Sequence, residues 1–295
     1  MKTLTITKHL GRLGNNMIYV ICGIDYCVEN NIDQIVFSDP KPGNTHQIGL
    51  LINDNKIIIS DGNSGGVGDI SKWGHSFYTG IVPFYKRKEI VQKYILPKLR
   101  FSPVVLGNND LVIHLRGGDV FCRPHFAYVQ PPLSFYEQVI NSREWDRIYL
   151  LSEDNRNYCY DVLRSKYDCI SCLDNKGRHG GNLWGFTDDL ARMIGATNFV
   201  CSKSSLSPLI VQLSKTIKNV YLCDFFIDNP VKRQQPPNER FERGENEIWW
   251  SKDFIGRSTD FEYNGVNYYV YDYSDYITKF NKNDYCLTRD RILNN

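Results

Sequence analysis

Residues that could bind a phosphate lie together near the middle of the chain, at the end of an apolar run. Residues 111–115 are apolar apart from His114, and Arg116, two glycines and Asp119 follow. This pattern predicts a buried strand that opens into a sharp polar turn. A guanidinium at the carboxyl end of a strand suits phosphate oxygens, because it is planar, forked and permanently charged. An ion pair between Arg116 and Asp119 is the structural alternative.

A second polar turn lies near the amino terminus. Residues 4–7 are typical of a short strand, residues 11–16 form a glycine-bounded turn, and an apolar segment of helical length follows. Asn15 or Asn16 would cap this helix, which is an ordinary structural role for one of them. Capping does not account for Arg12 between two glycines, so Arg12 is a second candidate for ligand binding.

A third turn separates a predicted strand at residues 198–202 from a predicted helix at residues 206–215. The residues between them are Lys203, Ser204 and Ser205. Helix amino termini expose unpaired N–H groups and the positive end of the helix dipole, so they bind anions readily. The serine hydroxyls would add donors, and capping of the helix by a serine is the structural alternative.

These turns resemble the motifs of a family of sugar transferases. The chain contains Gly11-Arg12-Leu13-Gly14-Asn15-Asn16-Met17, then His114-x-Arg116-x-Gly118-Asp119, then Ser204-Ser205-x-Ser207. Their types and order resemble the fucosyltransferase superfamily, which includes the α1,2-, α1,6- and protein O-fucosyltransferases. The α1,2 family is the most similar. Residues 132–136, 150–154 and 188–193 are similar to further landmarks, and the resemblance covers residues 5–215.

The resemblance implies a fold and a reaction. Members of the superfamily have an α/β fold with two Rossmann-like lobes facing a cleft, called GT-B, and they invert the anomeric centre of GDP-fucose without a required metal or other cofactor. By position, Arg116 would hold the β-phosphate, and His114 and Asp119 would shape the turn or contact the nucleoside. The residues implied to bind substrate are Gly14, Asn15, His114, Gly118, Asp119, Asp154, Ser204, Ser205 and Leu206.

The chain departs from the α1,2 pattern at two positions. Gly117 stands where that family often has a second arginine, and Leu206 replaces an aromatic residue in the serine turn. Both positions bear on which sugar nucleotide the enzyme uses as donor and on which glycosidic linkage it forms. We expect transfer of fucose to a glycan hydroxyl, with an α1,2 linkage favoured. The alternatives are a transferase that uses GDP-mannose or GDP-rhamnose, and a non-catalytic relative that binds the sugar or the nucleotide.

The reaction itself places demands on the residues. Loss of the sugar leaves extra negative charge on the diphosphate, and fixed arginine and N–H donors must stabilise that charge where no metal does so. The acceptor hydroxyl needs a general base, for which Asp119, His125, Glu153, Asp154 and a leaving phosphate oxygen are candidates. The expected catalytic residues are Arg116, Arg12, His125 and Glu153. The structural alternatives are solvation of His125 in its loop and helix capping by Glu153 and Asp154.

Composition agrees with an enzyme of moderate size. The chain has 295 residues, of which 42% are hydrophobic and 23% charged, so it can bury a full core. A net charge of +2 argues against a nucleic-acid partner, which requires a clustered basic surface. The glycine-rich residues 62–68 lack the Lys-Ser/Thr ending of a phosphate loop, and no G-x-G-x-x-G follows a strand, which argues against kinases and dehydrogenases.

We expect two Rossmann-like lobes, one on the acceptor side at residues 1–102 and one that binds the nucleotide sugar at residues 103–225. An aromatic-rich tail at residues 226–295 would pack on them. In the tail, residues 261–273 around Asn264-Gly265 predict a β-hairpin. Packing of these aromatic side chains on the core is the alternative to a role in acceptor binding.

No apolar stretch approaches the length of about 18 residues that a membrane span requires. We therefore expect a soluble, cytoplasmic protein of the bacterial or viral type. Its partners would be a nucleotide-sugar donor and a glycan acceptor, and a homodimer is left open. The nine cysteines are expected to be buried free thiols, and the lone C-x-x-C at Cys169 and Cys172 lacks the second pair of a zinc site.

Overall fold

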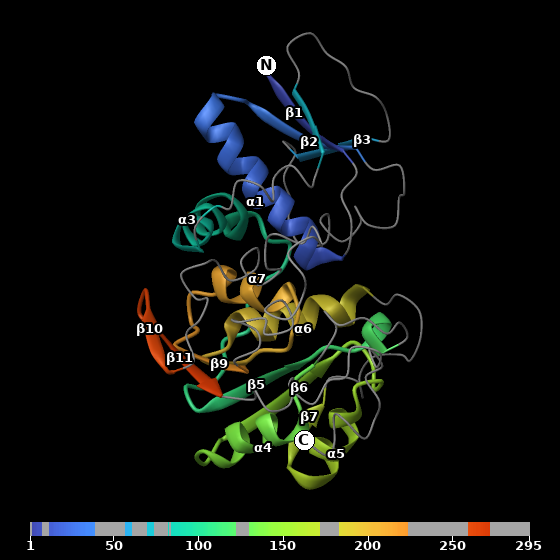
Figure 1. Cartoon of the computed structure of the whole chain (residues 1–295), viewed down its shortest axis with the longest axis vertical. Helices are drawn as coiled ribbons and strands as arrows, with labels where there is room; N and C mark the ends of the chain where they lie inside the picture. Colours follow the sequence, from blue (N-terminus) through green and yellow to red (C-terminus); the bar gives the residue numbers. More distant parts are fainter. Residues whose placement is uncertain are drawn as a thin grey trace, which may run out of the picture. The chain divides into compact units, whose positions relative to one another are not determined.

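The computed structural model divides into two compact units, between Ser102 and Pro103, and each is described by itself (Figure 1). The structure describes residues 2–7, 12–38, 57–60, 70–73, 82, 84–121, 130–171, 183–223 and 259–271. Within these ranges, no helix combines the length and the apolar character needed to cross a membrane.

The first unit is built on a four-stranded parallel sheet in the order β3-β2-β1-β4. Its strands are β1 (Thr3–Thr7), β2 (Gln34–Ser38), β3 (Ile57–Ser60) and β4 (Ile70–Trp73). Helix α1 (Leu13–Asn30) follows β1 and packs closely on the sheet, since a Cβ atom at Gly23 would lie 2.9 Å from Cδ1 of Ile6. Helix α3 (Phe84–Ile90) contacts α1, and Lys86 forms ion pairs with Asp25 and Glu29. The chain then passes through a π-helical turn (Val91–Ile95) and a 3-10 turn (Leu96–Lys98).

The second unit is built on a seven-stranded sheet in the order β10-β11-β9-β8-β5-β6-β7. Its strands are β5 (Asp110–Leu115), β6 (Arg147–Ser152), β7 (Cys169–Ser171), β8 (Asn198–Val200), β9 (Asn219–Cys223), β10 (Phe261–Tyr263) and β11 (Val266–Tyr271). Its helices are α4 (Leu133–Asn141), α5 (Tyr158–Lys166), α6 (Leu183–Gly195) and α7 (Leu206–Leu213), with a 3-10 turn at Gly118–Phe121. All strand pairs are parallel except β10 with β11.

The order of the strands is that of a doubly wound sheet. From β5 the chain adds β6 and β7 on one side, and then β8, β9 and β11 on the other. This is the Rossmann order 3-2-1-4-5-6, and its direction reverses between β5 and β8. Helices α4 and α5 lie on one face of the sheet, and α6 and α7 lie on the other (Figure 1). The α/β fold class expected from the sequence is confirmed, with a parallel sheet in each unit.

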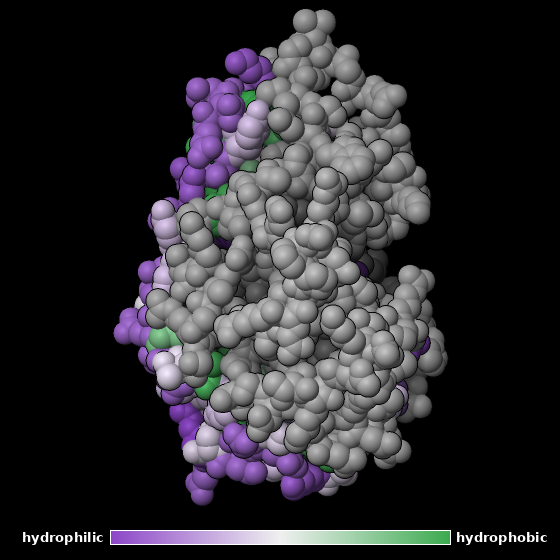
Figure 2. All heavy atoms as spheres, viewed as in Figure 1, coloured by the Kyte–Doolittle hydropathy of each residue, from purple (hydrophilic) through white to green (hydrophobic). Residues whose placement is uncertain are grey.

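The central strands of the second unit are buried on both faces. Every residue of β5 is buried, and Leu111, Val112 and Ile113 are fully inaccessible to solvent. Continuous apolar strands of this kind are expected in a parallel sheet that helices cover on both faces. The described surface visible in Figure 2 is largely hydrophilic, with small and scattered hydrophobic areas.

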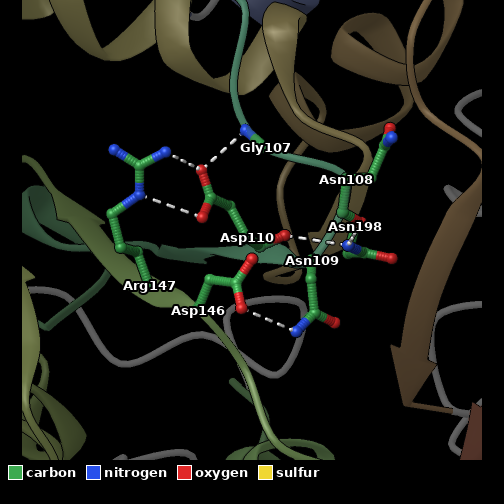
Figure 3. A network of polar contacts seen from close by, with 7 residues as sticks. All are labelled: Gly107, Asn108, Asn109, Asp110, Asp146, Arg147 and Asn198. Carbon is green, nitrogen blue, oxygen red and sulfur yellow. Dashed lines mark hydrogen bonds and ion pairs between the residues drawn. The ribbon is translucent and has the colours of Figure 1, made fainter.

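A network of polar contacts holds the amino-terminal ends of the central strands together (Figure 3). The buried carboxylate of Asp110 accepts hydrogen bonds from the backbone N–H of Gly107, at 2.7 Å, and from the guanidinium of Arg147, at 2.8 and 3.0 Å. Nδ2 of Asn198 donates to the carbonyl oxygens of Asn108 and Asp110, at 2.9 and 2.8 Å. These contacts connect β5, β6 and β8 at the edge opposite to their polar carboxyl-terminal turns.

The predicted hairpin near the carboxyl terminus is confirmed as β10 and β11. Its turn residues Asn264 and Gly265 have φ values of 50° and 73°, as the tight turns of hairpins require. Strand β11 pairs in parallel with β9, and Tyr269 stacks on Tyr221 with ring centroids 5.0 Å apart. This part of the tail therefore extends the sheet of the second unit. Residues 226–258 and 272–295 lie outside the described residues.

Candidate functional site

Two of the polar turns lie next to each other at the carboxyl-terminal edge of the second sheet. Strand β5 leads into Arg116, and the neighbouring parallel strand β8 leads into the turn at residues 201–205 and then into α7. The edge between these two strands is the point where the strand order reverses. Ligands of open α/β sheets bind in the crevice outside such a point.

His114 connects these two turns. Its Nδ1 atom lies 2.9 Å from Oγ of Ser202 and 3.2 Å from Oγ of Ser207, and the Ser207 hydroxyl donates to the carbonyl oxygen of Ser202 at 3.1 Å. His114 is buried, with 8% of its surface exposed. These contacts favour the turn-shaping role of His114 over direct contact with a nucleoside.

The serine turn forms the start of α7. Oγ of Ser204 accepts a hydrogen bond from the backbone N–H of Leu206 at 3.1 Å, and its carbonyl oxygen accepts from the N–H of Ser207. Ser205 precedes the helix without a side-chain capping bond. A hydroxyl that accepts a bond retains its proton for donation, so the bond from Leu206 is compatible with donation by Ser204 to a ligand. Ser204, Ser205 and Leu206 are all half-buried.

The turn after Arg116 lies against Asp154. The backbone N–H of Gly118, whose φ is +73°, donates to Oδ1 of Asp154 at 3.1 Å. A Cβ atom at Gly117 would lie 2.5 Å from that same oxygen and 3.2 Å from the backbone nitrogen of Asp154. A side chain at this position requires Asp154 to move. The contact gives a physical reason for glycine where the α1,2 pattern often has arginine.

The two acidic residues after β6 differ in their surroundings. Oδ1 of Asp154 also accepts from the backbone N–H of Arg156 at 3.0 Å, and Oδ2 lies 3.4 Å from Nε of Arg156. Both carboxylate oxygens of Asp154 thus contact the protein, although the residue was expected at the substrate. Glu153, beside it, is exposed at the carboxyl-terminal edge of the sheet.

Asn157 contacts the candidate site and was missed by the sequence analysis. It is fully buried, and its Nδ2 atom donates to the carbonyl oxygen of Arg116 at 3.1 Å. Its Oδ1 atom caps α5 by accepting from the N–H of Cys159 at 3.0 Å. An asparagine just before a helical segment indicates a cap. The contact with Arg116 depends on the pairing of β5 with β6, which has no local signal.

In the first unit, Arg12 lies at the amino terminus of α1. It is exposed and occupies the N-cap position, with no capping bond from its side chain, and its carbonyl oxygen accepts from the N–H of Asn16 at 3.0 Å. The expectation that Asn15 or Asn16 caps the helix is wrong. The helix begins at Leu13 because that residue is buried with the apolar face of the helix. Both asparagines and the buried Gly14 therefore belong to its first turn.

The arginine and serine turns are therefore adjacent within the second unit, and Arg12, Gly14 and Asn15 belong to the first. His125 lies in residues 122–129, outside the described residues, as does the glycine-rich segment at 62–68. The backbone of Asp119 is described, and its side chain is not.

The described cysteines are free thiols. Cys169 is half-buried, and the other five are buried as expected: Cys22, Cys27, Cys159, Cys201 and Cys223. Cys201 lies next to the serine turn, and burial raises the pKa of its thiol well above the usual value. Burial likewise raises the pKa of Cys169 to about 11. These groups stay protonated near neutral pH and are poor nucleophiles. Within the described ranges, no group of three or more His, Cys, Asp and Glu residues could hold a metal ion.

Gly117→Ala is expected to destabilise the protein by about 1–3 kcal/mol, because the new methyl group overpacks against Asp154. Urea unfolding measures the loss. In an Asp154→Ala background the carboxylate is absent, so the same substitution should cost much less. Equal costs in the two backgrounds would show that Asp154 does not restrict position 117.

Comparison with known proteins gives distant structural matches only. No protein-family model matches the sequence, and no curated protein is significantly similar to it. Among solved structures, POFUT1 in complex with GDP-fucose matches with 11% identity and a TM-score of 0.41, covering 74% of this chain and 97% of that one. POFUT1 in complex with GDP matches with 9% identity and a TM-score of 0.40, covering 72% and 94%.

Proposed function

We propose that the protein is a glycosyltransferase that transfers fucose from GDP-fucose to a hydroxyl of a glycan, with inversion at the anomeric carbon. The observation that carries the proposal is the adjacency of the Arg116 turn and the serine turn at the reversal point of a Rossmann-order sheet. The choice of GDP-fucose as the donor and of fucosyl transfer as the reaction comes from the sequence motifs, which resemble those of fucosyltransferases.

The second unit offers several donors to a diphosphate. Arg116 is half-buried and supplies a fixed positive charge, while the serine turn supplies hydroxyls at the positive end of the α7 dipole. Both kinds of donor favour a group that gains negative charge as the reaction proceeds. Because His114 connects the two turns, these donors are positioned before a ligand arrives.

The first unit presents a related feature, and the proposal gives it a part in donor binding. Arg12 and Asn15 lie at the start of α1, which follows β1 as the helices of doubly wound sheets do. A positive charge at a helix amino terminus suits a phosphate or a polar nucleoside group. The resemblance to the fucosyltransferase motifs assigns Arg12 and Asn15 to donor binding, and the proposal keeps that assignment.

The proposed chemical step is a single displacement. The acceptor oxygen forms a bond to the anomeric carbon as the bond from that carbon to the β-phosphate oxygen breaks, and GDP leaves with the bonding electrons. The acceptor proton passes to a general base. Glu153 is exposed and follows β6 where that strand pairs with the end of β5, so we propose it as the base. Asp119, His125, Asp154 and a phosphate oxygen are the other candidates.

Calorimetric titration with GDP, GDP-fucose, GDP-mannose and UDP, in the presence of EDTA, tests the donor site. We expect GDP to bind without a metal, GDP-fucose to bind more tightly than GDP-mannose, and UDP to bind weakly. Absence of guanine-nucleotide binding would contradict the proposal. Preference for another GDP-sugar would favour the alternative donor, and binding without turnover on a panel of glycan acceptors would favour a non-catalytic relative.

A further inference from the structure

The turn between β6 and α5 contacts the arginine turn on both sides of Gly117. On one side, Nδ2 of Asn157 donates to the carbonyl oxygen of Arg116 at 3.1 Å. On the other side, Oδ1 of Asp154 accepts from the backbone N–H of Gly118 at 3.1 Å. The backbone just before and just after Gly117 is therefore bonded to one short segment of the neighbouring strand–helix connection.

We propose that Asn157 is a positioning residue, which with Asp154 sets the direction in which Arg116 leaves the sheet. Consecutive glycines give a chain wide freedom in φ and ψ, so Gly117 and Gly118 do not hold Arg116 in place by themselves. The two bonds from the β6–α5 turn restrain the backbone on both sides of Gly117. The role in ligand binding rests on the proposed function, whereas the restraint of the turn does not.

Restraint of the backbone matters because Arg116 is a preorganised donor in the proposed site. A guanidinium that already points at its anion loses little freedom when the ligand binds, and binding is tighter for that reason. A loosened turn lets the same guanidinium sample directions that do not reach the anion. Loss of the restraint therefore weakens anion binding without removing any positive charge.

The choice of asparagine at position 157 supports this role. As a helix cap it needs only an oxygen that accepts from the N–H of Cys159, and aspartate or serine provides such an oxygen equally well. Asparagine alone among these carries an NH₂ group, which here reaches the carbonyl oxygen of Arg116. The cap function and the contact with Arg116 can thus be separated by substitution.

The test uses Asn157→Asp and Asn157→Ser. Both variants keep a capping oxygen and lose the amide donor; the serine variant also avoids burying a carboxylate. Two measurements are made: amide hydrogen exchange of the free protein, followed by mass spectrometry, and titration with GDP. We expect faster exchange in residues 115–118, unchanged exchange in α5, and a Kd for GDP raised about tenfold, as loss of one hydrogen bond predicts.

Asn141→Asp is the matched control. Asn141 is exposed at the end of α4, and its amide donates one hydrogen bond, to the Tyr167 hydroxyl at 3.2 Å. The same chemical change there removes one donor near the opposite edge of the sheet. We expect this variant to match the wild type in GDP affinity and in exchange at residues 115–118.

Each outcome decides the inference. Unchanged exchange at residues 115–118 in both variants would overturn it, as would wild-type affinity for GDP in a variant whose turn exchanges faster. If amide exchange in α5 became faster by the same factor as in residues 115–118, Asn157 would act only as a helix cap. If the wild-type protein does not bind GDP, the proposed function fails. Faster exchange confined to residues 115–118 would then still support the restraint of the turn.

Discussion

Replacing Arg116 with alanine is expected to lower the rate of sugar transfer by about 10²- to 10³-fold, the usual cost of losing one preorganised donor to a developing charge. Arg116 follows the buried strand β5, is half-buried, and lies at the point where the strand order of the second sheet reverses. Arg116→Lys keeps the charge but loses the planar fork, so we expect it to restore only part of the rate. The measurement is kcat/KM for GDP-fucose with each variant.

Arg164→Ala is the control for this result. Arg164 is an exposed arginine on α5, and its removal subtracts the same charge from the same unit. We expect its kcat/KM to stay within a factor of about two of the wild type, since surface substitutions away from a site have small effects. A wild-type rate for Arg116→Ala, with circular dichroism unchanged, would remove the arginine turn from the proposed mechanism.

Gly195→Ala is expected to have the largest effect on stability, a loss of about 3 kcal/mol in the free energy of unfolding. Gly195 ends α6, and a Cβ atom there would lie 1.8 Å from the carbonyl oxygen of Val104 and 2.6 Å from its carbonyl carbon. Backbone atoms cannot rotate away as a flexible side chain can. The backbone N–H of Val104 also donates to the carbonyl oxygen of Ala191 at 3.0 Å, so the two segments would have to separate.

Urea unfolding of Gly195→Ala and Gly265→Ala measures this effect against a matched substitution. A Cβ atom at Gly265 would meet no atom within 4 Å, and its cost comes only from a φ of +73°. That conformation costs an alanine about 1–2 kcal/mol. If Gly195→Ala loses no more stability than Gly265→Ala, the contact between α6 and the segment at Val104 is looser than the structure shows.

Local pattern was enough to predict the strand–turn–helix units that carry the candidate site. The apolar run at residues 111–115 became β5, and the Asn264-Gly265 pair became the turn of a hairpin. The amino-terminal helix shows the limit of such patterns. The first turn of this helix contains polar residues, so the local pattern did not show that the helix begins at Leu13. Burial of Leu13 with the apolar face of the helix decides where it begins.

The sequence by itself determined that this is an α/β protein with an arginine turn and a serine turn after buried strands, because apolar runs and glycines act over a few residues. Only the tertiary structure decided the strand order that makes these turns neighbours. It also decided the contacts of His114 with Ser202 and Ser207, and that of Asn157 with Arg116. The physical reason is that hydrogen bonds between parallel strands join residues far apart in the chain, and no local pattern records which strands will pair.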